Sequence, residues 1–379
     1  MRLQTLLSLG LASTFASAHT VLTTIFIDGQ NQGDGTCIRM GVDPERVTFP
    51  ISSIDSPDMA CGFNGDTPVA FTCPAKAGST ITMAFRAWAD DSSRGPIDIS
   101  HVGSISVYLK HLSSPSSSAS GSGWFKIYHS GYSQSAKAWS AETLIKNNGL
   151  LTTDLPSSLP SGDYLLRTEV LALQNYPETQ FFVNCAQLRI ASGTAATAAS
   201  IPSDKTVSIP GHVKADDKGL TYNIFEIDPV ASPYPIPGPK PYFPTTTTTA
   251  AGTNTKATDS SSGSQLSQDG LVPKTCILKN ANWCAAEIPD FSGEDECWAS
   301  SDNCWKQVEA CYNSAPPSGG KGCKLWSDKK CEVTQRRCAE GDWNGPQDKG
   351  AIVASWDEAS EPIPGGQLPP VDVGEDRVE

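Results

Sequence analysis

Hydrophobic positions between residues 19 and 236 fall into many short, β-prone runs. Clusters of Gly, Pro, Ser and Asn separate these runs, and helical periodicity over three or more turns is scarce. The pattern predicts an all-β domain, an immunoglobulin-like or fibronectin-like β-sandwich with long loops. The clearest expected strands are 21–27, 80–88, 104–109, 164–173 and 180–190.

The first eighteen residues follow a different pattern. Arg2 precedes an apolar run over 6–15, and Ala16-Ser17-Ala18 forms a small-residue cleavage signal. This order is typical of a secretory signal peptide, so cleavage after Ala18 is expected to leave His19 as the first residue. No later run approaches the roughly 20 apolar residues of a membrane span. We therefore expect a secreted, extracellular protein that makes no membrane contact.

Three further regions follow the expected sandwich domain of residues 19–240. A linker is predicted at 241–270, because half of the residues from 245 to 270 are Ser or Thr and cannot build a core. Residues 271–345 form a small cysteine-rich unit. Residues 346–379 are acidic and rich in Pro and Gly, and we expect a disordered tail there.

Cysteines in the unit 271–345 recur at helical spacing. Cys297, Cys304 and Cys311 are seven residues apart, as are Cys331 and Cys338, so each set can line one face of a helix. Short helices joined by disulfides are predicted, since so small a unit has little apolar volume. A metal cluster is the alternative, but the unit has no Cys-x-x-Cys pair and no histidine. Its five tryptophans fit either a carbohydrate-binding strip or, for most of them, the core.

Charge and cysteine content narrow the function. Lys and Arg number 28 against 41 Asp and Glu, which gives a formal net charge of −13 and argues against binding to nucleic acid or anionic membranes. The 12 cysteines are an even number and suit an oxidising compartment.

An N-terminal His19 offers two nitrogens to one metal ion, its free α-amine and its imidazole. A second imidazole would complete an all-nitrogen site, and copper suits such a site better than other common divalent ions. His101 is the candidate, because it directly precedes an expected strand. Each histidine also has a plainer interpretation, His101 as a core residue and His19 as whatever residue cleavage leaves first.

Several separated segments carry a family resemblance. They are His19-Thr20-Val21, Ile27-Asp28-Gly29, Ser100-His101-x-Gly103, Val107-Tyr108-Leu109, Trp124-Phe125-Lys126-Ile127, Leu159-Pro160-Ser161-Gly162-Asp163-Tyr164, Gln180-Phe181, Ile209-Pro210-Gly211 and Tyr234-Pro235-Ile236-Pro237-Gly238-Pro239. Together they resemble the fungal copper-dependent lytic polysaccharide monooxygenases of auxiliary activity family nine, formerly glycoside hydrolase family sixty-one.

The resemblance implies a function for the domain. His19 and His101 would bind one copper ion as a histidine brace. With electrons from a small reductant or a secreted dehydrogenase, and with dioxygen or hydrogen peroxide, such a monomeric enzyme cuts β-1,4-linked polysaccharide oxidatively at the surface of cellulose or a related glucan. The family stacks sugar rings on flat tyrosines, and Tyr234 occupies a matching position.

The resemblance also implies two disulfides. Cys73 and Cys185 match the long-range disulfide of the family, which leaves Cys37 and Cys61 as the second pair of the domain.

The chain departs from the family close to the expected metal. Gln174 stands where the family usually has His, and Phe182 where it usually has the axial Tyr, so Phe182 would close the axial side without ligating. Gln180 and Phe182 project from one strand face, so Gln180 can still donate a hydrogen bond near the axial side. Gln174 can orient its neighbours but is a poor acid, which predicts slower turnover with copper binding retained.

Two other functions stay open. If Gln174 and Phe182 belong to a decayed site, the protein is a non-catalytic copper-binding or cell-wall-binding protein. A β-1,4-endoglucanase would need two carboxylates across the scissile bond. The candidates Asp90, Asp91, Glu142 and Glu169 show no pattern that pairs them.

Overall fold

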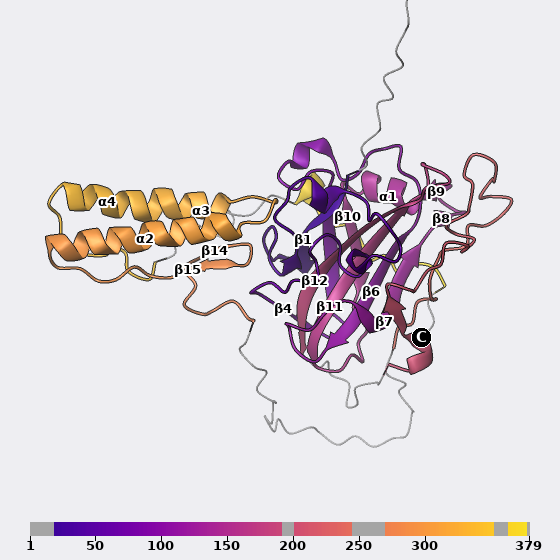
Figure 1. Cartoon of the computed structure of the whole chain (residues 1–379), viewed down its shortest axis with the longest axis horizontal. Coiled ribbons are helices and arrows are strands. Elements are labelled where there is room, and N and C mark those ends of the chain that lie inside the picture. The colour runs from indigo at the N-terminus through magenta and orange to yellow at the C-terminus, as the bar shows by residue number, and fades with distance from the viewer. Residues whose placement is uncertain (1–18, 192–200, 245–269, 352–362, 377–379) are drawn as a thin grey trace, which may run out of the picture.

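A computed structural model describes residues 19–191, 201–244, 270–351 and 363–376. Two parts are visible, a β-sandwich within residues 19–244 and a helical arm within residues 270–351 that projects from its side (Figure 1). The predicted all-β class and the helical cysteine-rich unit are both confirmed. The expected signal peptide and most of the expected linker lie outside the described residues. Within the described ranges, no helix has the length and apolarity needed to cross a membrane.

The sandwich consists of two sheets. The smaller has the antiparallel order β10-β5-β1-β2. Its strands are β1 (Val21–Ile27), β2 (Gln30–Asn31), β5 (Thr80–Arg86) and β10 (Leu150–Asp154). The larger has the order β13-β7-β6-β11-β12-β3, with β4 added in parallel to β12. Its strands are β3 (Ile38–Arg39), β4 (Cys73–Lys76), β6 (Ile105–Leu112), β7 (Gly121–Ser130), β11 (Gly162–Ala172), β12 (Gln180–Ala191) and β13 (Val207–Ile209).

Short elements in the loops complete the sandwich. They are η1 (Arg46–Thr48), η2 (Pro57–Met59), η3 (Ser92–Arg94), β8 (Tyr132–Ser133), β9 (Ala138–Trp139), α1 (Ser140–Lys146) and η4 (Ser203–Lys205).

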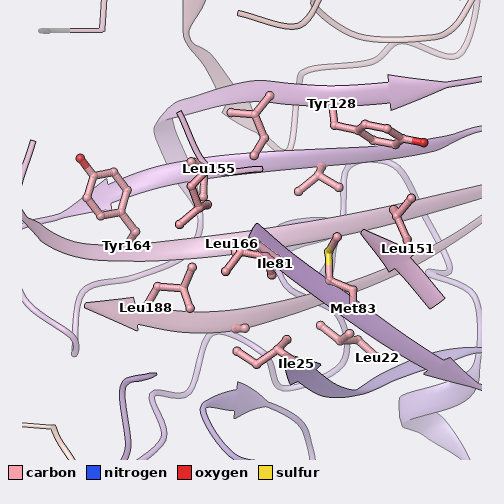
Figure 2. Close-up of a cluster of buried hydrophobic side chains, with 14 of the residues drawn as sticks. Leu22, Ile25, Ile81, Met83, Tyr128, Leu151, Leu155, Tyr164, Leu166 and Leu188 are labelled. Carbon is pink, nitrogen blue, oxygen red and sulfur yellow. The ribbon is translucent and has the colours of Figure 1, made fainter. Parts of the chain in front are cut away.

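Apolar side chains from both sheets meet between them and form the core (Figure 2). Ile25 of β1 and Met83 of β5 approach from the smaller sheet, and Leu166 of β11 and Leu188 of β12 from the larger one. All four are buried. Removing a side chain of this size from water stabilises the fold by about 1.5–3 kcal/mol. Because such cores are closely packed, the sandwich supports the loops at its ends.

Disulfide pairing in the sandwich differs from the expectation. Cys37 pairs with Cys73, and Cys61 pairs with Cys185, so the expected pairs Cys73–Cys185 and Cys37–Cys61 are wrong. Strand register gives the reason. Leu188 lies beside Cys73 in the β4–β12 pair, so Cys185 is three residues further along, roughly 10 Å away. That distance exceeds the reach of a disulfide.

The helical arm begins with a hairpin and continues as two antiparallel helical segments. Its elements are β14 (Leu278–Asn280), β15 (Trp283–Ala285), α2 (Glu294–Ser314), α3 (Lys321–Trp326), η5 (Ser327–Cys331) and α4 (Glu332–Ala339). Three disulfides join α2 to the second segment, and a fourth closes the hairpin. The pairs are Cys297–Cys338, Cys304–Cys331, Cys311–Cys323 and Cys276–Cys284.

A π-helical turn lets all three interhelical disulfides form. The partners on α2 are seven residues apart, whereas Cys323 and Cys331 are eight apart. In an α-helix eight residues overshoot two turns by roughly 80°, which would rotate Cys323 away from α2. The turn η5 between these two cysteines is π-helical and wider, so it absorbs the additional residue and keeps both on one face.

Tryptophans of the arm divide between its core and its surface. Trp326 is buried, and Trp283 and Trp305 pack partly against the same cluster. Trp298 and Trp343 are each 37% exposed. The core interpretation is confirmed for Trp326, while two rings stay accessible.

The arm is held against the sandwich through the loop that follows β2. The Asn282 side chain accepts a hydrogen bond from the Cys37 backbone N–H and donates to the Gly35 carbonyl, both at 2.9 Å. Thr36 donates to the Ala281 carbonyl at 3.2 Å. A Cβ at Gly35 would lie only 2.5 Å from Pro316, so glycine permits this close approach. These contacts fix the base of the arm on the sandwich.

Part of the acidic tail is ordered, so the expectation of disorder is wrong for residues 363–376. Tyr128 donates a hydrogen bond to the Asp372 carboxylate at 2.9 Å, and the Asp372 N–H donates to the Thr152 carbonyl at 2.7 Å. The Glu375 carboxylate accepts from the Gly131 N–H at 2.8 Å. The tail includes η6 (Pro364–Gly366). Its acidic residues thus satisfy hydrogen-bonding groups of the sandwich, which composition alone does not show.

A buried ionic network ties loops to the larger sheet. Glu169 contacts Arg167 at 2.7 Å and His212 at 2.8 Å, and Arg167 also donates to the Met59 carbonyl at 2.8 Å. Burial alone raises the pKa of Glu169, but the charge of Arg167 and the hydrogen bond with His212 outweigh it and hold that pKa well below its ordinary value. Glu169 is therefore an ionised structural residue.

Removing the Cys61–Cys185 disulfide tests the observed pairing. The bond closes a separation of 124 residues, so Cys61→Ser with Cys185→Ser is expected to lower the free energy of unfolding of the sandwich by roughly 4–5 kcal/mol. Denaturant unfolding measures this loss. The double variant Cys276→Ser with Cys284→Ser, in the arm, should leave the sandwich unchanged. Peptide mapping without reduction that recovered Cys73 linked to Cys185 would contradict the structure.

Acid is expected to destabilise the fold through two buried histidines. Burial lowers the pKa of His212, and burial with the charge of Lys126 lowers that of His129 to about 3. Below about pH 6.5 these histidines bind protons in the unfolded chain but not in the folded protein. Each histidine therefore lowers the free energy of unfolding by up to about 1.4 kcal/mol for every pH unit of acidification. Urea unfolding of the chelator-treated protein from pH 7.5 to 5 measures the slope. His129→Gln should reduce it and the exposed control His111→Gln should not; equal slopes in all three proteins would refute this origin.

Candidate metal centre

His19 lies at the edge of the smaller sheet, two residues before β1. Val21 pairs with Arg86 of β5 in antiparallel register, and extending that register places His19 opposite Trp88. The two rings stack with centroids 4.7 Å apart and planes inclined by 24°. Phe49, which directly follows η1, makes a T-shaped contact with the His19 ring, with centroids 5.0 Å apart. The His19 side chain is only 5% exposed, so its imidazole is held in a largely enclosed position.

His101 reaches the same region from the loop before β6. Gly103 makes this possible, because a Cβ there would lie 1.9 Å from the Leu171 carbonyl oxygen. With that approach, the Leu171 N–H donates to the Ser104 carbonyl and the Leu173 N–H to the Val102 carbonyl, both at 2.9 Å. The spacing Ser-His-x-Gly is thus explained, since glycine lets the His101 loop pack against the end of β11.

The two ring nitrogens of His101 have different surroundings. Nδ1 lies 3.3 Å from the Ser100 hydroxyl and 4.0 Å from the Asp98 carboxylate, whereas Nε2 is buried without a hydrogen-bond partner. Burial lowers the pKa of His101; Asp98 opposes this shift, and the nearby charge of His19 adds to it. The ring is therefore a neutral imidazole with a buried, unsatisfied nitrogen. A metal ion would satisfy that nitrogen, and a carboxylate behind the other nitrogen is usual for histidine ligands.

Gln174 and Gln180 meet at the open end of the β11–β12 pair. Ala172 pairs with Gln180 in the strand register, and beyond it the Gln174 amide N–H donates to the Gln180 side-chain oxygen at 2.9 Å. This contact uses the acceptor of Gln180 and leaves its NH₂ group as the donor. The Gln174 oxygen is buried without a partner. The structure therefore brings the two predicted glutamines together.

Phe182 packs beside His101. Their ring centroids are 6.0 Å apart and Phe182 is buried in the core between the sheets. Cys185 belongs to the cluster on the other side of the larger sheet, as the alternation of side chains along β12 requires for residues three apart. Phe182 provides an apolar wall with no ligating atom.

Tyr234 does not fulfil its predicted role as a sugar-stacking residue. It is only 9% exposed, its hydroxyl donates to the Gly219 carbonyl at 3.1 Å, and its ring contacts Trp139 and Tyr222. It is a packing residue, so that expectation is wrong. Phe49, which the sequence did not single out, is 44% exposed and contacts His19.

The donor set fits copper better than a site of carboxylates or thiolates. Among the described residues, no three His, Cys, Asp or Glu side chains form a group that could hold a metal ion. His19 and His101 nevertheless lie close enough for a charge on His19 to lower the pKa of His101. A two-imidazole set with a nitrogen as the further donor is the chemistry that copper prefers.

Comparisons with known proteins show the family of this chain. The profile of Auxiliary Activity family 9, formerly GH61, matches residues 19–234. AA9 family lytic polysaccharide monooxygenase C of Aspergillus tamarii is 43% identical over 360 residues, covering 90% of this chain and 91% of the relative. AA9 family lytic polysaccharide monooxygenase H of Botryotinia fuckeliana is 42% identical over 340 residues, covering 88% and 76%.

A solved structure, CvAA9A, supports the sandwich. It superimposes with a TM-score of 0.52 at 29% identity, covering 58% of this chain and 96% of its own. The two relatives above align over far more residues than the sandwich contains, so their similarity extends into the helical arm. This chain belongs to Auxiliary Activity family 9, the lytic polysaccharide monooxygenases.

Proposed function

We propose that this protein is a secreted copper-dependent monooxygenase that oxidatively cleaves a β-1,4-linked polysaccharide, cellulose or a related glucan. It would use an external reductant with dioxygen or hydrogen peroxide. The observation that carries the proposal is the buried, unsatisfied Nε2 of His101 close to His19. Membership of the family supports the same chemistry.

His19 and His101 would hold the copper ion. Removal of residues 1–18 would free the α-amine of His19 as a third nitrogen donor, with a reference pKa of about 7.7–8.0 that permits metal binding near neutral pH. When bound, copper supplies the redox chemistry that amino acid side chains lack. The neutral state of His101 suits this role, because a protonated imidazole cannot ligate.

The side chains near the two histidines would orient a hydrogen-bond donor and exclude water. Gln174 fixes the Gln180 amide by their 2.9 Å hydrogen bond, so the NH₂ group of Gln180 would be the donor on the side of the copper ligands. Phe182 excludes water from its side of His101, since it is buried and apolar. Neither glutamine is an acid near neutral pH, so they position and donate hydrogen bonds but do not deliver protons.

The substrate would approach over the exposed aromatic and apolar groups beside the histidines. Phe49 contacts His19 and keeps 44% of its surface exposed, and Ile99, two residues before His101, is 80% exposed. Apolar groups of this kind suit the flat apolar faces of pyranose rings. An external small reductant or a secreted dehydrogenase would supply the electrons. The protein would act as a monomer.

Hydrolysis is a poor alternative, because three of the four carboxylates considered for it have structural partners. Glu169 is paired with Arg167 and His212, Glu142 accepts from the Trp139 N–H at 2.7 Å, and Asp91 accepts from the Ser93 N–H at 3.0 Å.

A non-catalytic copper-binding or wall-binding protein is favoured by one feature. Gln174 and Phe182 stand where groups able to exchange a proton would be expected.

The decisive experiment alters the N-terminus. A variant with one extra Ala before His19 turns the chelating amine into an amide, so Cu(II) affinity should fall by at least about 100-fold and oxidised sugar products should disappear. Mass spectrometry of the secreted protein establishes its first residue. Calorimetry measures the affinity, and product analysis on cellulose with and without ascorbate measures activity. Equal affinity and product yield in the extended variant would refute the mechanism, and unoxidised products made without reductant would indicate a hydrolase.

Breaking the glutamine pair should slow turnover without releasing copper. Gln174→Leu removes the donor that orients Gln180, so oxidised product is expected to form roughly 10- to 100-fold more slowly while Cu(II) affinity stays unchanged. Gln134→Leu, on an exposed loop, is the matched control. A parent protein that binds copper but yields no oxidised product, together with product from Gln174→His plus Phe182→Tyr, would favour the non-catalytic alternative.

A further inference from the structure

We propose that Trp88 is a positioning residue for the metal centre, which fixes the plane of the His19 imidazole before copper binds. This inference rests on the proposed function and adds a residue to it. Its basis is the stacked pair of rings, with centroids 4.7 Å apart and planes inclined by 24°.

Strand register places the indole there. β1 and β5 are antiparallel, with Val21 opposite Arg86 and Leu22 opposite Phe85. The same register continued outward by two residues sets His19 opposite Trp88, where cross-strand neighbours are close enough for their side chains to pack. The ladder itself ends at Val21 and Arg86, because the Thr20 N–H donates to the Thr48 carbonyl and the Ala87 N–H to the Gly95 carbonyl. The contact therefore forms directly beyond the paired ends of two core strands.

The indole is itself held in place. Trp88 forms an isolated β-bridge with Asp91, and the Asp91 carboxylate accepts a hydrogen bond from the Ser93 N–H at 3.0 Å. This tight turn leads into η3 and brings the Arg94 guanidinium over the Trp88 ring, 4.2 Å from its centroid. A cation over an indole face is an attractive contact. Trp88 therefore has a fixed plane against which a second ring can align.

Fixing the His19 ring matters because one residue would supply two ligands. Chelation by the α-amine and the imidazole of the same residue requires one combination of side-chain torsions, and each free rotation lost on binding weakens affinity. Stacking on Trp88 and the edge contact from Phe49 restrict rotation of the ring about its bond to Cβ. Trp88 would thus orient the ligating imidazole without contacting the metal, as residues that surround metal ligands commonly do.

The test combines Cu(II) affinity with two spectroscopic measurements on the full-length secreted protein. Trp88→Leu removes the aromatic face and is expected to weaken Cu(II) binding about 10-fold or more and to change the hyperfine pattern of the copper EPR spectrum. Trp88→Phe keeps a stacking ring, so affinity and EPR pattern should stay close to the parent. It should nevertheless lose most of the tryptophan fluorescence quenching that Cu(II) causes, because Trp88 is the described tryptophan in contact with His19.

Trp298→Leu is the matched control, since Trp298 is a partly exposed tryptophan on the arm. It should change neither affinity, EPR spectrum nor the extent of quenching. Circular dichroism and thermal unfolding check that each variant folds. If Trp88→Leu does not fold, the quenching lost in Trp88→Phe still decides.

Two results would overturn the inference: unchanged affinity and EPR spectrum in a folded Trp88→Leu protein, or undiminished quenching in Trp88→Phe. Either result, obtained while the parent binds copper and forms oxidised products, leaves the proposed function intact. A parent that begins at His19 and shows no copper EPR signal would overturn both proposals.

Discussion

The candidate metal centre depends on one close backbone approach, that of Gly103 to the end of β11. Two hydrogen bonds, from Leu171 to Ser104 and from Leu173 to Val102, join the His101 loop to the strand that leads to Gln174. Any side chain at residue 103 would collide with the Leu171 carbonyl and separate these segments. Because β11 also pairs with β12, the same contact sets the His101 ring beside that of Phe182. His19 lies just beyond the paired ends of β1 and β5, near enough to affect the pKa of His101.

Sequence patterns predicted what depends on local periodicity. The expected strands 21–27 and 180–190 correspond to β1 and β12, and the seven-residue cysteine spacing correctly indicated helices joined by disulfides. The two histidines were found through the chemistry of an N-terminal histidine together with a family motif. Their location near each other is a property of the sheets, which place residues 82 positions apart along the chain at one end of the sandwich.

The failures share a physical cause, since each concerned a contact between distant segments. The pairing of Cys73 follows from a parallel register with β12 that no local pattern encodes. Tyr234 was expected to face a sugar but packs against Trp139 from another loop. Composition indicated disorder for the acidic tail, because it cannot show that the Gly131 N–H and the Tyr128 hydroxyl offer partners to these carboxylates. Trp88 could have been found by extending the register of β1 and β5 once their pairing was known.

The ordered end of the chain changes how the arm can move. The arm leaves the sandwich after residue 244, and the chain returns to the sandwich at residue 363, so the arm is a closed excursion attached at two points and braced at its base by Asn282. A module joined by a single tether would sweep a wide volume around the enzyme. The movement of this one is restricted by both attachments, and a protease that cut within residues 245–269 would leave it attached through its other connection.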